Sequence, residues 1–129
     1  MRGITSNFDL INMAKQYNIN LDAVIYKNQL TKFDPNKNAS YILDLHNESD
    51  ESDGHWLALY IKGNKAIYFD SFGIEYPNII KQFCKGKQLE YNHKQIQSMN
   101  TEWCGSYCLA FLNFMQQGYT LKQFTDLFD

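Results

Sequence analysis

The chain has 129 residues, with 44% hydrophobic and 16% aromatic residues and a formal net charge of −2. This length predicts a single domain over residues 1–129, and the apolar content excludes a disordered chain. The weak negative charge argues against nucleic-acid binding. No run approaches the ~20 apolar residues that cross a bilayer, so we expect no membrane partner.

The chain contains three cysteines, an odd number without the spacing of a secreted disulfide framework. Reduced thiols are therefore expected. The first residues also lack the apolar block of a signal peptide. Both features predict a soluble, intracellular protein.

A first helix is predicted near the N-terminus, capped by Asn7. Its apolar positions recur at the helical period: Leu10, Ile11, Ala14 and Tyr17. The next stretch is polar, contains Pro35 and is expected to be extended. It leads into a predicted strand over Ala39–Leu45 and then into an acidic loop over 47–54.

Two apolar runs in the middle of the chain predict buried strands, over Trp56–Ile61 and Ala66–Phe69. Gly63 and Asn64 lie between them and suit a two-residue hairpin turn. The two runs therefore predict an antiparallel hairpin.

A short helix over Pro77–Phe83 and a strand over Gln88–Tyr91 follow the hairpin. A longer helix is predicted to begin at Cys104 and to end at Gly118. Its buried stripe is Cys108, Phe111, Leu112 and Met115. Thr120 is predicted to cap a last helix. That helix is expected to bury Leu121, Phe124, Leu127 and Phe128. The order indicates an α+β fold in which helices pack on a central antiparallel (mixed) sheet.

Cys104 has the features of a nucleophile. A helix N-terminus presents free N–H groups and positive potential, which favour a thiolate over a thiol. Gly105 follows it and leaves room for a substrate carbonyl beside the Cys104 amide. An isolated cysteine at such a position is more often structural, so the assignment depends on partners elsewhere in the chain.

His55 and Asp70 supply those partners. A two-residue turn places Lys62 opposite Lys65 and Leu57 opposite Asp70, which makes His55 the diagonal neighbour of Asp70 on the same face. A carboxylate there can hold one imidazole nitrogen and leave the other to take the proton from sulfur. Gln97 adds a side-chain donor, besides the cysteine amide, for the oxyanion that forms during attack on a carbonyl.

The order of these residues resembles the adenain (adenovirus protease) family of cysteine peptidases. The likeness rests on His55-Trp56, on the strand pair that ends in Asp70, and on Gln97-x-x-Asn100-x-x-x-Cys104-Gly105 before an apolar helix. It extends from Leu43 to about Met115. The wider group also contains the peptidases that remove SUMO and related ubiquitin-like modifiers, whose Gln-to-Cys interval is commonly one residue shorter.

The resemblance implies a papain-like arrangement in which the catalytic cysteine begins a helix. It implies that Cys104 is the nucleophile, His55 the base, Asp70 the orienting acid and Gln97 the oxyanion donor. Trp56 is then expected to wall a narrow groove for small residues such as Gly. Trp103 and Gly105, beside the nucleophile, complete the predicted substrate contacts.

By the same resemblance, the expected function is cleavage of viral capsid and core precursors during virion maturation, inside the virion and the host cell. The expected partners are these protein substrates and an activating peptide, and no cofactor is expected. Two alternatives remain, an isopeptidase that removes ubiquitin-like modifiers and a non-catalytic binding module of the same fold. The presence of all four chemical positions disfavours the binding module.

A further interpretation is that the cysteines are ligands of a zinc site. Cys104 and Cys108 lie one helical turn apart, and Cys84 or a histidine would have to complete the ligand set. The spacing lacks the paired knuckles of structural zinc sites, so we expect no metal, and we interpret Cys108 as a core residue. His46 and His93 have no recognisable partner in the sequence and are assigned no role.

Overall fold

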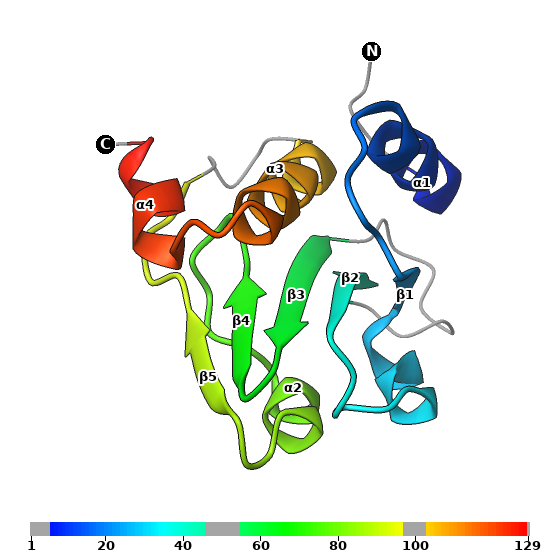
Figure 1. The fold of residues 1–129 in the computed structure, drawn as a ribbon, viewed down its shortest axis with the longest axis vertical. Coiled ribbons are helices and arrows are strands. Elements are labelled where there is room, and N and C mark those ends of the chain that lie inside the picture. The colour runs from blue at the N-terminus through cyan, green and yellow to red at the C-terminus, as the bar shows by residue number, and fades with distance from the viewer. Residues whose placement is uncertain (1–5, 46–54, 97–102, 129) are drawn as a thin grey trace.

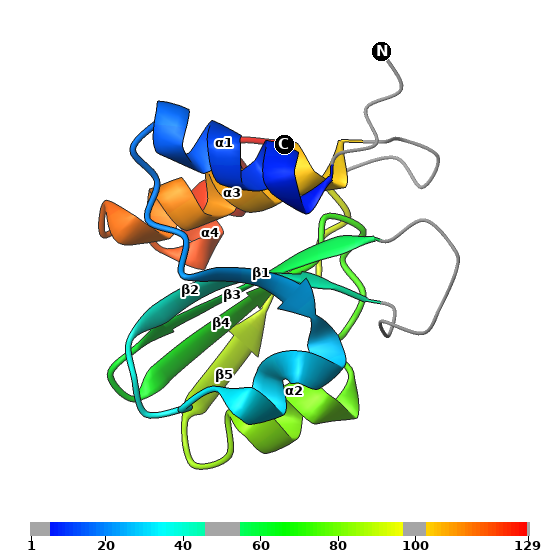
Figure 2. The same ribbon diagram turned by 90° about the vertical axis from the view of Figure 1, so that its right-hand side faces the viewer.

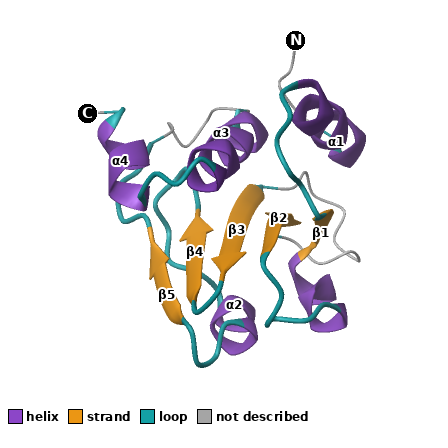
Figure 3. Ribbon diagram, viewed as in Figure 1, coloured by secondary structure: helices purple, strands orange, loops and turns teal. Residues whose placement is uncertain are grey.

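The structure, a computed structural model, describes residues 6–45, 55–96 and 103–128. The strands are β1 (Ala23–Tyr26), β2 (Ala39–Asp44), β3 (Trp56–Lys62), β4 (Lys65–Phe69) and β5 (Gln88–Tyr91). The helices are α1 (Asn7–Gln16), α2 (Asn78–Phe83), α3 (Cys104–Gln116) and α4 (Leu121–Asp126), with a 3-10 helix η1 (Lys27–Lys32). Figure 3 shows how helices and strands are distributed.

The strands form one sheet in the order β1-β2-β3-β4-β5 (Figure 1). The three central strands are antiparallel, whereas β1 and β5 run parallel to their neighbours β2 and β4. The sheet is therefore mixed. Together with the start of α3 at Cys104, it confirms the predicted α+β fold.

The β3–β4 hairpin has the predicted register. It turns on Gly63 and Asn64, and Lys62 pairs with Lys65. Gly63 has a φ of 59°, a backbone conformation that favours glycine. The ladder ends at the pair Ala58 and Phe69, so Asp70 lies one residue beyond it.

Helices cover both faces of the sheet (Figure 2). α1, α3 and α4 pack on one face around an apolar core. That core includes Leu10, Ile42, Phe69, Phe111 and Phe124. η1 and α2 pack on the other face around a second core that includes Leu30, Tyr41, Leu57, Leu59 and Ile80. α3 packs on the sheet through the first of these cores, and it contacts β3 more extensively than it does any other strand.

The stretch between α1 and β2 differs from the prediction. It was expected to be extended, but it contains the edge strand β1 and the 3-10 helix η1. Strand β1 has only four residues and pairs in parallel with β2. A short apolar run that pairs at long range carries no periodic signal in the sequence, which explains why the prediction was wrong.

The helix ends require two corrections. Ser6, rather than Asn7, caps α1, and its hydroxyl accepts the Asp9 N–H at 3.1 Å while the Asp9 carboxylate accepts the Ser6 N–H at 3.1 Å. Thr120 caps α4 as predicted. Leu127, predicted to be buried, is 60% exposed because α4 ends at Asp126. Among the helices of the described ranges, none has the length and apolar character to cross a membrane.

Candidate active site

Cys104 is the first residue of α3 and is almost buried, with 8% of its surface exposed. Its Sγ accepts a hydrogen bond from the main-chain N–H of Trp56 at 3.4 Å. Trp56 is the first residue of β3, so the sulfur lies where the start of the helix meets the start of the central strand. The N–H groups of the first turn of α3 point toward the same region.

His55 lies next to this sulfur and is bonded to Asp70. The Nε2 of His55 is 2.7 Å from Oδ1 of Asp70, and their side chains are 13% and 3% exposed. With Nε2 engaged by the carboxylate, Nδ1 is the nitrogen left to face Cys104. The structure therefore brings together three of the four residues predicted to carry out the chemistry.

The surroundings of His55 favour its protonated form. Burial lowers the pKa of His55, but hydrogen bonds to Asp70 and Cys104 and the charges of both groups outweigh burial and raise this pKa to about 9. The imidazole is therefore protonated at neutral pH. A positively charged imidazolium beside sulfur can stabilise a thiolate and can donate a proton to a leaving group.

Phe72 contacts both members of the His55–Asp70 pair. No role was predicted for this residue from the sequence. Its ring lies parallel to the His55 imidazole, with centroids 4.2 Å apart and an interplanar angle of 1°. Its main-chain N–H donates to Oδ1 of Asp70 at 2.9 Å. In the sequence, Phe72 is only an apolar residue in a turn, and no signal indicated that it would cover the imidazole.

Asn92 is a second contact that the sequence did not reveal. It is 3% exposed and bonds to both main-chain polar groups of Asp70. A single buried Asn beyond a short strand has many possible partners, so its role becomes visible only in the fold.

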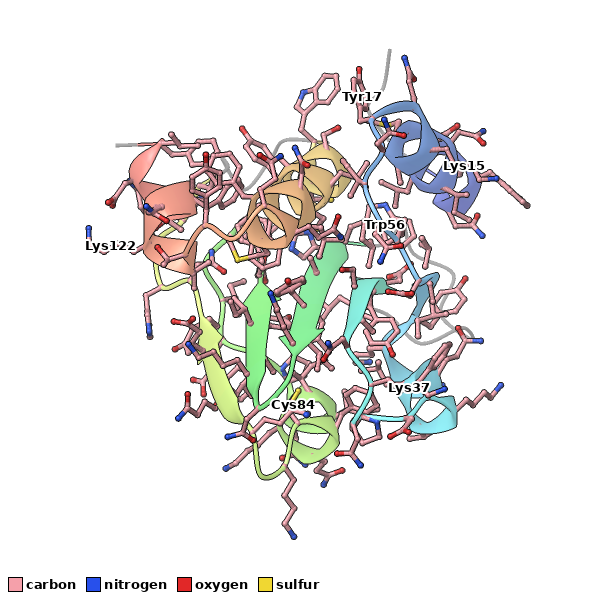
Figure 4. The ribbon with its side chains drawn as sticks, in the orientation of Figure 1. Lys15, Tyr17, Lys37, Trp56, Cys84 and Lys122 are labelled. Atoms are coloured by element: carbon pink, nitrogen blue, oxygen red, sulfur yellow. The ribbon has the colours of Figure 1, made fainter. Side chains whose placement is uncertain are left out.

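The other two cysteines lie in apolar surroundings. Burial raises the pKa of the Cys84 thiol to about 11, although the charge of Lys87 lowers it in part. Burial also raises the pKa of Cys108 well above its usual range, and the charges of Cys104 and Asp70 raise it further. Cys108 is fully buried, which agrees with its interpretation as a core residue. Cys84 directly follows α2 and belongs to the second core, on the opposite face of the sheet from α3 (Figure 4).

A groove of about 520 Å³ begins at the Trp56 side chain. It is lined by Ser6, Asn7, Val24, Ile25, Tyr26, Gln29, Asp44 and Trp56. The groove therefore runs from the start of β3 across β2 and β1 to the start of α1. It extends toward the β1 edge of the sheet, whereas Asp70 lies beyond β4 in the opposite direction. Figure 4 shows Trp56 below α1 at this end of the sheet.

The remaining predicted substrate contacts lie at the start of α3. Trp103 precedes the helix and is half exposed, while Gly105 is buried in the first turn. Gln97, His46 and the acidic loop 47–54 lie outside the described residues. His93, which was given no partner, has its ring 4.2 Å from that of Tyr91. Within the ranges that the structure describes, no three His, Cys, Asp or Glu side chains are grouped as a metal site.

Neither a protein-family model nor a curated protein sequence matches this chain. Its fold is similar to that of the ASFV pS273R protease, with a TM-score of 0.65 and 15% sequence identity. This match covers 97% of the present chain and 62% of that protein. The selenomethionine form of the same protease matches with a TM-score of 0.62, 14% identity and the same coverage.

The chain thus has a fold similar to that of this protease and spans less than two thirds of its length. At this level of identity the likeness concerns the fold alone. The resemblance to adenain stays a prediction.

Proposed function

We propose that this chain is a cysteine endopeptidase. The observation that carries the proposal is the 2.7 Å bond from His55 to Asp70, directly beside a cysteine at a helix N-terminus. This is the arrangement that nucleophilic catalysis by a thiol needs: a nucleophile, a base next to it and a third group that orients the base. The shared fold with a viral protease supports the same conclusion.

In the proposed reaction, Sγ of Cys104 attacks the carbonyl carbon of a peptide bond. The Cys104 N–H and the Gln97 side chain stabilise the oxyanion that forms. The His55 imidazolium then gives its proton to the leaving amine as the C–N bond breaks, which leaves a thioester on Cys104. The neutral imidazole takes a proton from water as the water oxygen attacks the thioester carbon. The C–S bond then breaks, which releases the acid and restores the Cys104 thiolate beside the His55 imidazolium. Asp70 keeps Nε2 engaged throughout, so that Nδ1 faces the reacting atoms.

We infer the two sides of the substrate from the position of the groove. His55 must reach the leaving amine, so the leaving side lies toward His55 and Asp70. The acyl side then extends the other way, past Trp56 and into the groove over β2 and β1. Trp56 and Trp103 flank the point of attack, and Gly105 leaves space there. This favours small residues such as Gly at the cleavage site.

We further propose that the substrates are viral capsid and core precursor proteins. The test is cleavage of peptides with and without Gly at the scissile bond by the wild-type chain and by Cys104→Ala. The small substitution at a helix start is expected to preserve the fold and to abolish cleavage. Undiminished cleavage by this variant would end the cysteine-peptidase proposal. Turnover of ubiquitin-like conjugates but not of peptides would indicate an isopeptidase instead.

A further inference from the structure

We propose that Asn92 is a positioning residue that sets the place of the Asp70 carboxylate, and through it His55, by clamping the main chain of Asp70. This inference rests on the proposed function, because it concerns how the same site is held. Asn92 does not contact the reacting atoms.

The side-chain amide of Asn92 is hydrogen-bonded to both main-chain polar groups of Asp70, and we call this arrangement the clamp. Its Oδ1 accepts the Asp70 N–H at 3.0 Å, and its Nδ2 donates to the Asp70 carbonyl at 2.6 Å. The Nδ2 also donates to the carbonyl of Lys94 at 3.1 Å. An Asn amide has one acceptor oxygen and two donor hydrogens, so these three bonds use both ends of the group.

Asp70 needs such a clamp because of its place in the sheet. β4 ends at Phe69, and the last pair of β4 with β5 is Tyr68 with Tyr91. Asp70 is therefore the first residue without a ladder partner, yet it is only 2% exposed. Asn92 is likewise the first residue after β5. Its side chain replaces the missing strand partner. It gives the buried Asp70 N–H an acceptor and adds a second donor to the Asp70 carbonyl, which also accepts the Gly73 N–H.

Beside these bonds of Asn92, the turn over residues 70–73 lies in close contact with residues 94–96. The Gly73 N–H donates to the Asp70 carbonyl at 2.8 Å, and the Ile96 N–H donates to the Ser71 carbonyl at 2.8 Å. Gly73 has a φ of +75°, and a Cβ at this position would lie 2.8 Å from the carbonyl carbon of Lys94. Only glycine fits this contact, which holds the Asp70 turn directly against residues 94–96.

This arrangement has a consequence for the site. Clamping both main-chain groups of Asp70 fixes the direction of its Cα–Cβ bond, and thereby the carboxylate that meets His55. The same Asn92 amide fixes Lys94, three residues before Gln97 in the sequence. One buried side chain thus supports the orienting acid and the segment that leads to the proposed oxyanion donor.

The first test compares Asn92→Ala with Ser40→Ala. Ser40 is a matched control because it is 2% exposed and hydrogen-bonded to Gln116 at 2.9 Å, at the far end of the sheet. Both variants are expected to melt at lower temperatures. Only Asn92→Ala should lower kcat, by roughly 10²-fold, with little change in KM, because misplaced catalytic groups cost rate rather than binding.

A second readout is independent of activity. In Asn92→Ala the NMR titration of the His55 ring should move from about 9 toward its ordinary value of 6.5, because the carboxylate no longer holds the imidazolium. In Ser40→Ala the titration should not move. The His55 signal is assigned by its loss in His55→Gln.

Gly73→Ala keeps the inference testable if Asn92→Ala fails to fold. Its control is Gly86→Ala, because Gly86 also has a positive φ but has open space where the Cβ would lie. Gly73→Ala should shift the His55 titration and lower kcat, while Gly86→Ala should do neither.

The outcomes separate the two proposals. If His55 in folded Asn92→Ala or Gly73→Ala still titrates at about 9, as in the wild-type chain, the positioning role is overturned, whatever the activity. If the titration shifts as expected but Cys104→Ala still cleaves peptides, the positioning role stands and the proposed function falls.

Discussion

Asp70 and His55 meet across the end of the β3–β4 hairpin, with Oδ1 of the carboxylate 2.7 Å from Nε2 of the ring. This contact depends on the register of a two-residue turn at the opposite end of the hairpin, where Lys62 pairs with Lys65. A one-residue slip would place His55 and Asp70 on opposite faces of the sheet. The hairpin, packed between two apolar cores, therefore sets the geometry of the pair.

Replacement of the carboxylate by an amide tests the orienting role of Asp70. In Asp70→Asn the side chain keeps its size and can still accept the Phe72 N–H, but it loses its negative charge. We expect kcat/KM to fall roughly 10²- to 10⁴-fold because the imidazolium is no longer oriented or stabilised. The measurement is steady-state peptide hydrolysis.

Asp126→Asn is the matched control for this substitution. Asp126 is an exposed carboxylate that pairs with Lys122, at 2.8 Å within α4. Its loss should leave kcat/KM unchanged. Equal activity of the two variants would show that Asp70 has no part in catalysis.

The ring of Phe72 is expected to hold the plane of the imidazole. Phe72→Leu removes the stacking and should lower kcat roughly 2- to 10-fold, in line with the ~0.5–1.5 kcal/mol of an aromatic pair. Phe72→Tyr keeps the ring and should retain activity. If the Leu and Tyr variants were equally active, the parallel contact would have no catalytic role.

The stability of the fold should depend on pH through His55. Its pKa in the folded chain, about 9, lies above the ordinary value of 6.5. The folded state therefore binds this proton more tightly than the unfolded state does. The resulting stabilisation is fully present below pH 6.5 and is lost as the pH rises through about 9.

The free energy of unfolding, measured with urea for wild type and His55→Gln, tests this linkage. The difference between the two chains should be larger at pH 6 than at pH 10, by at most about 3 kcal/mol. Groups that do not interact with His55 titrate equally in both chains and cancel in the difference, so the difference reports His55 together with its partners Asp70 and Cys104. A difference independent of pH would contradict the raised pKa of His55.

The three thiols should differ in reactivity. Burial raises the pKa of Cys84 and of Cys108, so few of these side chains are thiolates at pH 7.5. Cys104, beside the His55 imidazolium, should react with iodoacetamide roughly a hundred-fold faster or more. Peptide mapping by mass spectrometry reports each site, and equal labelling of all three would exclude an activated Cys104.

The parts of the fold that could be predicted are those with strong local signals. The turn at Gly63-Asn64 between two apolar runs predicted the hairpin and its register, and hence the approach of His55 to Asp70. The apolar period after Cys104 predicted α3. These features depend on residues close together in the sequence, where period and turn chemistry are sufficient.

The parts that could not be predicted depend on contacts between distant segments. Strand β1 is defined by parallel pairing with β2, which a four-residue run does not reveal. Asn92 reaches Asp70 across 22 residues of sequence. The stacking of Phe72 on His55 requires the Asp70 turn to fold back on the hairpin. Such contacts become apparent only once the whole sheet is assembled.

Trapping of the acyl-enzyme tests the central claim most directly. The wild-type chain is mixed with a Gly-containing peptide, quenched in acid within the first turnover and mapped by mass spectrometry. We predict that the acyl fragment is found as a thioester on Cys104, and that Cys104→Ala neither carries it nor cleaves the peptide. Cleavage without an adduct on Cys104, continuing in Cys104→Ala, would contradict the assignment of this residue as the nucleophile.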